Sequence, residues 1–147
     1  MKFQDYLQSS IKIANEEKEI LDLLSQKDSL DKIELRAAKS SLQTIIENAI
    51  GKAKRILKYY NCPITPTRSK DAILFMYEMG LIEEGVYKAL IGAIGFRNSM
   101  IHDYMDFNEE ILKSILKEKL YIDVYNFLIE IPEYSDTHLK RIENFTI

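Results

Sequence analysis

Hydrophobic residues recur every three or four positions along most of the chain. In the second segment they would all face one side of a helix: Leu42, Ile45, Ile46, Ala49, Ile50, Ala53, Ile56, Leu57 and Tyr60. No stretch alternates with a period of two, as a half-buried strand would. The pattern therefore predicts an all-α protein built from amphipathic helices.

Prolines and glycines divide this pattern into separate helices. The chain has only three prolines, and its first fifty residues contain no glycine. The two prolines of NCPITPT must end the second helix, because proline cannot continue one. We expect helices at about 3–25, 29–60, 69–79, 83–104 and 108–131.

Capping residues support these bounds. Thr67 or Ser69 is expected to cap the third helix, and Gly80 to end it. Asn108 is expected to cap the last helix, which Pro132 closes. The tail, residues 132–147, is expected to add a weak helical turn or to stay mobile. Without repeats or low-complexity segments, residues 1–147 predict a single domain, an up-and-down bundle of four or five helices.

Composition narrows the class of protein. Hydrophobic residues make up 46% and charged residues 29%, as in ordinary soluble domains. We find no secretory signal in the leading residues and no apolar run long enough to span a bilayer, so a cytoplasmic protein is expected. The single cysteine, Cys62, forms no internal disulfide and cannot build a zinc site alone.

Charge is unevenly distributed. The net charge of −3 argues against binding nucleic acid through overall electrostatics, and acidic residues crowd the first third of the chain. A local basic stretch contains Lys52, Lys54, Arg55, Lys58, Arg68 and Lys70. A solvated helix face is the ordinary interpretation of such a stretch, and contact with a phosphate is the alternative.

The segment FRNSMIHDY places Arg97 in the middle of an apolar stripe. At about 100° per residue, five residues lie within about 60° of it on the helix: Val86, Leu90, Ile94, Ile101 and Tyr104. An unpaired buried charge costs several kcal/mol. Arg97 must therefore have a carboxylate partner, reach a wet cleft, or face a ligand from outside.

Other polar residues adjoin this arginine. Asn98 and His102 are four residues apart, so they lie on one strip at the rim of the arc, and Tyr104 is two turns beyond Arg97. The four side chains could line one cleft. On patterning alone, a structural core arginine and a histidine satisfied at a helix end are the commoner interpretations.

The opposite side of this helix carries small residues. They are Gly85, Gly92, Gly95 and Ser99. Small residues allow close approach of a second helix, although in a bundle they usually reflect packing within the chain. We find no glycine-rich phosphate loop, no paired histidines at metal spacing and no nucleophile elbow, and His138 has no patterned neighbours.

The motif RxxxxHxY, formed by Arg97, His102 and Tyr104, resembles that of the HepT-like toxins, a branch of the HEPN superfamily of small helical ribonucleases. The longer segment GLIEEGVYKALIGAIGFRNSMIHDY is similar to the characteristic segment of that family. Residues at about 30–131 follow its helix order and would form the HEPN-like core, preceded by the helix 3–25 and followed by the tail.

This resemblance implies a metal-independent endoribonuclease that acts as the toxin of a toxin–antitoxin pair and works as a homodimer without a cofactor. Arg97 and His102 would be the catalytic pair, supported by Asn98. Tyr104 would accept AMP from the antitoxin, an MntA-type minimal nucleotidyltransferase. The basic residues Lys54 and Lys58 become candidates for weak RNA binding.

The residue types fit this chemistry. A histidine titrates near neutral pH and could move a proton to or from RNA during attack by the 2′-hydroxyl. An arginine stays charged and could stabilise the negative charge on the phosphoryl oxygens. Because Arg97 and His102 lie about 140° apart on one helix, two helices meeting across a two-fold axis would combine them better than one.

Two other functions remain open. The same helical dimer could be a noncatalytic partner that presents a nucleotide or substrate to a minimal nucleotidyltransferase. The chain could also be a plain structural bundle, in which case Arg97→Met would stabilise the fold without functional cost.

Overall fold

The computed structural model describes residues 2–102 and 107–147, and within these residues all regular structure is helical. The helices are α1 (Phe3–Ser25), α2 (Lys32–Tyr59), α3 (Asp71–Glu78), α4 (Glu84–His102), α5 (Glu109–Lys117), α6 (Tyr121–Ile129) and α7 (Asp136–Glu143). The predicted all-α class is confirmed. Among these helices, none is long and apolar enough to cross a membrane.

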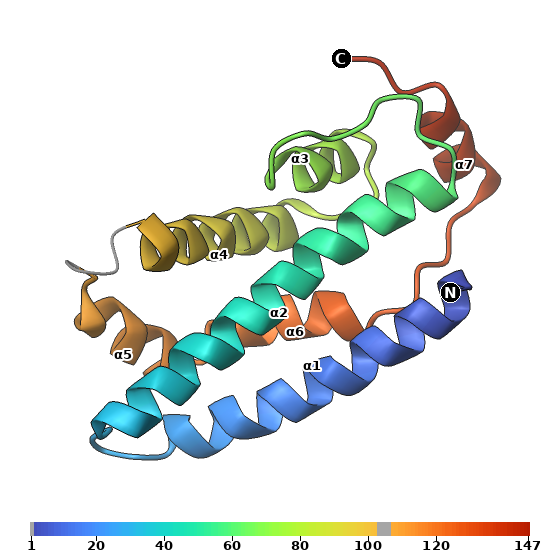
Figure 1. Cartoon of the computed structure of the whole chain (residues 1–147). Helices are drawn as coiled ribbons and strands as arrows, with labels where there is room; N and C mark the ends of the chain where they lie inside the picture. The colour runs from blue at the N-terminus through green and yellow to red at the C-terminus, as the bar shows by residue number, and fades with distance from the viewer. Residues whose placement is uncertain (1, 103–106) are drawn as a thin grey trace.

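The long helix α2 lies at the centre of the bundle (Figure 1) and packs against α1, α3, α4 and α6. Its buried side chains are mostly aliphatic: Ala38, Leu42, Ile45, Ile46, Ala49, Ile50, Ala53, Ile56 and Leu57. This is the stripe that the hydrophobic pattern predicted. It forms the core because several helices bury their own apolar faces against it.

Helix α1 lies antiparallel to α2 (Figure 1), with the start of one beside the end of the other. There the rings of Phe3 and Tyr59 stack with their centroids 4.1 Å apart. The bounds of α1 agree with the prediction. Helix α2 begins three residues later than the predicted 29, because Asp31 and Glu34 form a capping box that fixes its first turn.

Three helices end in the same way, with a left-handed residue that turns the chain. Asn61, Gly80 and Lys119 have φ of 63°, 74° and 54° and follow α2, α3 and α5. In each case two backbone N–H groups fold back onto the last turn, as in a Schellman motif; Leu120 N donates to Ile115 O at 3.0 Å. The end of the third helix at Gly80 is thus confirmed.

The predicted helix at 108–131 is wrong as one element, because the left-handed Lys119 divides it into α5 and α6. Its start is correct: the Asn108 side chain accepts a hydrogen bond from Glu110 N at 2.9 Å. Its end is earlier than expected, since α6 stops at Ile129, three residues before Pro132.

The tail is more ordered than the sequence indicated. Residues Asp136–Glu143 form α7, which begins with a capping box between Ser135 and His138, so His138 has a structural role. Ile142 is fully buried, and the Phe145 ring lies 4.9 Å from that of Phe75 in α3. The tail therefore docks on the bundle through apolar contacts.

The predicted cap of the third helix is wrong. The N-cap position of α3 is Lys70, which forms no side-chain capping bond. Thr67 instead donates to the carboxylate of Asp71, and Arg68 N donates to the same carboxylate at 2.9 Å. The carboxylate in the first turn thus orders the loop that leads into α3.

Candidate functional site

The candidate residues lie at the C-terminal end of α4, where the apolar arc of this helix leaves the core. Leu90 and Ile94 are the residues of α4 that are buried. One turn later Arg97 is half-buried, with 21% of its side chain exposed, and Ile101 and His102 are exposed. Arg97 therefore lies at the margin of the core, and not inside it as the helical periodicity suggested.

Arg97 has a carboxylate partner on the neighbouring helix. Its Nε donates to Glu47 Oε1 of α2 at 2.5 Å, and its Nη1 donates to Asn98 Oδ1 at 2.7 Å. The first of the three explanations for this arginine is thus correct. Among the described residues no acceptor contacts Nη2, so part of the guanidinium is still able to bind an anion.

His102 is the last residue of α4, and its side chain is exposed. It follows Arg97 by five residues, which places it about 140° around the helix and about 7.5 Å along the axis. The structure brings Arg97 and Asn98 into contact, but it does not bring His102 into contact with either. Tyr104 lies outside the described residues.

The side of α4 that carries the glycines is exposed to solvent. Gly85, Gly92 and Gly95 are exposed, and a Cβ added at any of them would meet no described heavy atom within 4 Å. The close approach of a second helix, which the small residues predicted, is not supplied by the part of the chain that the structure describes.

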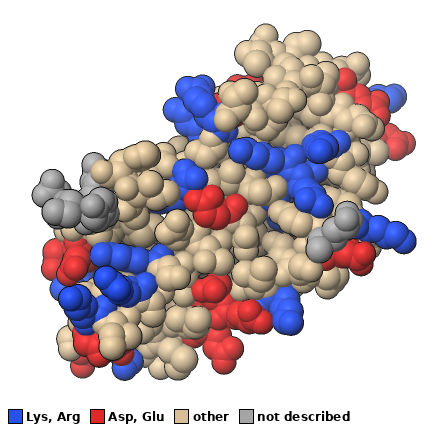
Figure 2. All heavy atoms as spheres, in the orientation of Figure 1, with Lys and Arg blue, Asp and Glu red and all other residues tan. Residues whose placement is uncertain are grey.

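Lys54 and Lys58 are exposed on α2, where they border a groove of about 550 Å³ formed with the loop at 61–66. Lysine and arginine side chains gather over this half of α2 (Figure 2). On the helix, Lys54 and Lys58 lie within about 20° of Glu47, at about 10 and 16 Å along the axis. The basic groove therefore continues the strip of α2 that contacts Arg97.

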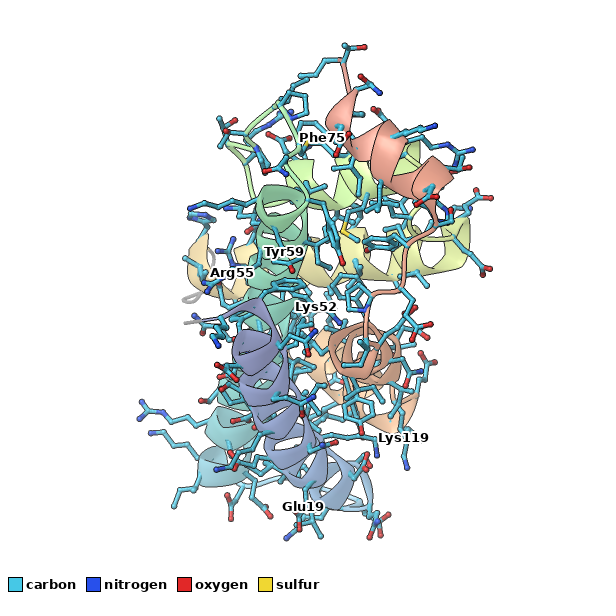
Figure 3. All side chains as sticks on the ribbon, turned by 90° about the vertical axis from the view of Figure 1, so that its right-hand side faces the viewer. Glu19, Lys52, Arg55, Tyr59, Phe75 and Lys119 are labelled. Atoms are coloured by element: carbon cyan, nitrogen blue, oxygen red, sulfur yellow. The ribbon has the colours of Figure 1, made fainter. Side chains whose placement is uncertain are left out.

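Lys52 does not belong to this basic surface. Its side chain is 1% exposed and lies between α2 and the end of α6, whereas Arg55 points to the outside (Figure 3). Burial lowers the pKa of Lys52 to about 8, and the Glu130 carboxylate opposes this shift. The inclusion of Lys52 in the basic stretch was therefore wrong, because the residue falls on the buried face of the helix.

Within the residues that the structure describes, no three histidine, cysteine or acidic side chains come together as metal ligands would. Cys62 is a free, half-buried thiol. Its Sγ contacts the carbonyl oxygen of Ile64 at 3.5 Å inside the loop, a contact typical of a structural residue.

Glu47 is the residue of this site that sequence reasoning missed. Arg97 was expected to need a carboxylate, and Glu47 lies beside the apolar stripe of α2. The two are 50 residues apart, and which acidic residue faces Arg97 depends on how two helices are rotated against each other. A periodic pattern on each helix does not determine that rotation.

Solved structures of other proteins share the fold of this chain. The structure is similar to the tri-AMPylated HEPN toxin of Shewanella oneidensis in complex with an MNT antitoxin, with 21% identity and a TM-score of 0.76 over 87% of this chain and 96% of that one. A crystal structure of a toxin–antitoxin with AMP-PNP is also similar, with 20% identity and a TM-score of 0.75 over 87% of this chain and 97% of that one. No protein of curated function matches the chain in sequence.

The family comparison covers most of the chain. Residues 7–131 match the family described as ribonuclease HepT-like, a span that runs from α1 to the residues just after α6 and includes the complete motif region of α4. The chain therefore belongs to the HepT-like ribonuclease family.

Proposed function

We propose that this protein is a metal-independent endoribonuclease, the toxin of a cytoplasmic toxin–antitoxin pair, and that Arg97 and His102 cleave RNA. The observation that carries the proposal is the arrangement of Arg97, whose guanidinium is held by Glu47 and Asn98 while Nη2 is left without a described partner. A fixed cation at the edge of the core, one turn before an exposed histidine, suits an RNA phosphate as ligand.

The proposed reaction uses RNA, water and these side chains. The 2′-oxygen attacks the adjacent phosphorus, a bond to the 5′-oxygen breaks, and a cyclic phosphate and a free 5′-hydroxyl result. His102 accepts the proton of the 2′-hydroxyl while water gives one to the leaving 5′-oxygen, or His102 donates to the leaving oxygen while water accepts the proton of the 2′-hydroxyl. Arg97 stabilises the charge that develops on the phosphoryl oxygens, and Asn98 supports it through the bond to Nη1.

Lys54 and Lys58 are proposed to bind the RNA backbone next to this site. Both are exposed, and they follow Glu47 along one strip of α2, at about 10 and 16 Å along its axis. We expect Lys54→Ala together with Lys58→Ala to reduce the salt dependence of RNA binding. If the double variant shows the same slope of log affinity against log salt concentration as the parent, this strip is excluded from the binding surface.

The active form is proposed to be a homodimer. The exposed glycine side of α4 supports close packing of a second copy, and the angle of about 140° between Arg97 and His102 favours a cleft built from two chains. Sedimentation of the parent protein should give the mass of two chains. The mass of one chain at micromolar concentration would contradict the composite cleft.

We propose that the RNA cleavage activity is inhibited when an MNT-type nucleotidyltransferase antitoxin transfers AMP to Tyr104. The similar toxin of Shewanella oneidensis is described as tri-AMPylated and in complex with an MNT antitoxin. An AMP on the motif tyrosine would bring a phosphodiester charge within two turns of Arg97 and compete for its guanidinium. Intact mass, with peptide mapping, measures whether Tyr104 carries this group.

The deciding experiment incubates the unmodified protein and its His102→Ala variant with total RNA in the presence of EDTA. Cleavage by the parent alone supports the proposal. No cleavage by the unmodified parent would contradict it and favour the noncatalytic partner of a nucleotidyltransferase, for which His102→Ala would weaken complex formation instead. Cleavage by both proteins would remove His102 from the reaction.

A further inference from the structure

The ion pair between Arg97 and Glu47 is more shielded from solvent than an ordinary surface ion pair. Both partners are on long helices, α4 and α2, and their side chains are 21% and 41% exposed. Exposed ion pairs are usually loose and contribute little to stability. This pair is partly shielded at the margin of the core, so its geometry is better defined.

Two acceptors fix the plane of the guanidinium. Glu47 Oε1 accepts from Nε at 2.5 Å, and Asn98 Oδ1 accepts from Nη1 at 2.7 Å. A planar group bonded at two of its nitrogens cannot rotate about its long axis without losing one bond. No bond to Nη2 is found among the described residues: one of its N–H groups lies on the same edge as Nε–H, beside Glu47, and the other points to the distal end of the guanidinium.

Based on this geometry and on the proposed ribonuclease function, we infer that Glu47 is a positioning residue that orients Arg97 for the phosphate and does not itself contact RNA. Asn98, which neighbours Arg97 in the motif, supplies one bond, and Glu47 supplies the other from a different helix. Arg97 would then be aligned before RNA arrives, which avoids the cost of ordering a long side chain during the reaction.

Two other roles of Glu47 make different predictions. As an occluding anion, Glu47 would occupy the phosphate position, and its removal would accelerate cleavage. Its bond to Nε still leaves the distal N–H of Nη2 without an acceptor among the described residues, which disfavours this role. As a general base, Glu47 would take the proton of the 2′-hydroxyl. Replacing its carboxylate would then stop the reaction, and it would also lower the residual rate of a variant that lacks Arg97.

The test compares Glu47→Ala with Glu47→Gln in single-turnover cleavage of an RNA oligonucleotide that the parent cuts. Glutamine keeps an acceptor for Nε but is not a base at neutral pH. We expect the single-turnover rate constant to fall about 10- to 100-fold in Glu47→Ala, the size expected for a misplaced catalytic group, and by less than about threefold in Glu47→Gln. Equal loss in both variants, no loss, or faster cleavage would overturn the inference.

A double-mutant cycle separates positioning from direct chemistry. If Glu47 acts only through Arg97, adding Glu47→Ala to Arg97→Ala should not lower the residual rate further. An additional loss in that background would assign Glu47 to the chemistry and overturn the inference. Glu84→Ala is the matched control, because it removes a carboxylate from the exposed pair with Lys88 at the other end of α4 and should leave the rate unchanged.

An NMR measurement tests the orientation without relying on cleavage. The Nε–H signal of Arg97, assigned by its absence in Arg97→Lys, should exchange slowly with water in the parent and in Glu47→Gln, and rapidly in Glu47→Ala. If this pattern is absent while the parent cleaves RNA, the positioning role fails and the proposed function stands. If the pattern is present and the parent cleaves no RNA, the proposed function fails, and with it any catalytic meaning of the orientation.

Discussion

Lys52 Nζ donates a hydrogen bond of 2.6 Å to the carbonyl oxygen of Phe127, 75 residues further along the chain. The same amine also donates to the carbonyl oxygens of Leu128 at 3.3 Å and of Glu130 at 2.5 Å. The three N–H groups of an ammonium thus meet three carbonyls at the C-terminal end of α6, where the helix dipole favours a cation. This contact ties the end of α6 to the central helix.

The first prediction is that Lys52→Met destabilises the fold by about 2 to 4 kcal/mol at pH 7. Methionine fills a similar volume but leaves buried carbonyl oxygens without a donor, and each costs about 1 to 3 kcal/mol. The desolvation of the charge is removed at the same time, which offsets part of this loss. Urea unfolding followed by circular dichroism measures the change.

Lys54→Met is the control for this variant, because Lys54 is exposed only two residues away on the same helix. A surface substitution of this kind should change the free energy of unfolding by less than about 0.5 kcal/mol. If Lys52→Met were as stable as Lys54→Met, the three carbonyl bonds would contribute no net stability.

A second prediction concerns pH. Burial lowers the pKa of Lys52 to about 8 in the folded protein, whereas a lysine in the unfolded chain titrates near about 10.4. Between these values the unfolded chain binds more protons than the folded one, so this group makes the free energy of unfolding rise with pH, by about 3 kcal/mol at most. The stability difference between the parent and Lys52→Met should therefore widen from pH 7 to pH 10.

Tyr121 titrates above this range, because burial and the bond to Asp22 raise its pKa to about 12. A raised tyrosine pKa stabilises the fold below about pH 10, and this stability is lost as pH rises further. Because Tyr121 is present in both proteins, its contribution cancels in the difference. A difference that stays constant from pH 7 to pH 10 would contradict the shift at Lys52.

The sequence determined the helices well where the chain ends them with a recognisable residue. Gly80, which adopts positive φ readily, was expected to end the third helix, and α3 ends within one residue of the predicted position. The end of α2 is also within one residue of the prediction, which rested on the two prolines, although the helix already ends before Asn61 with its positive φ. Lys119 adopts the same conformation, but lysine carries no such preference, so α5 and α6 looked like one helix. Capping by His138 was missed for a similar reason, since the usual capping box has a glutamate or glutamine there.

A third prediction follows from Lys119. Its φ of 54° strains a residue with a Cβ, and glycine removes this strain. Glycine also makes the unfolded chain more flexible, which offsets part of the gain. We expect Lys119→Gly to raise the free energy of unfolding by about 0.5 to 1 kcal/mol.

Lys113→Gly is the matched control, because Lys113 lies inside α5 and glycine should there lower the stability by about 1 kcal/mol. Thermal unfolding of both variants measures the two changes. If both variants lost stability equally, the break between α5 and α6 would not depend on the conformation of Lys119.

The site was only partly predictable for a different physical reason. The motif placed Arg97, Asn98 and His102 on one helix, and the cost of burying a charge required a partner for Arg97. Glu47 could not be chosen among the acidic residues, because side-chain periodicity defines the faces of helices but not which residues meet across them. The bond between Arg97 and Asn98 joins neighbouring residues of one helix, so it does not depend on how two helices are rotated against each other.

The last prediction is that Arg97→Lys lowers the single-turnover rate constant of RNA cleavage by about 10²- to 10³-fold, or about 2.7 to 4 kcal/mol of transition-state stabilisation, while the fold loses less than about 1 kcal/mol. A lysine keeps a charge near Glu47, but it has no planar edge with which to bond Glu47, Asn98 and a phosphate at the same time. Single-turnover cleavage and urea unfolding measure the two effects separately. Arg36→Lys, at an exposed arginine of α2, is the control and should change neither. Cleavage by Arg97→Lys at the parent rate would show that a point charge is sufficient, and that the fixed plane of the guanidinium has no part in the reaction.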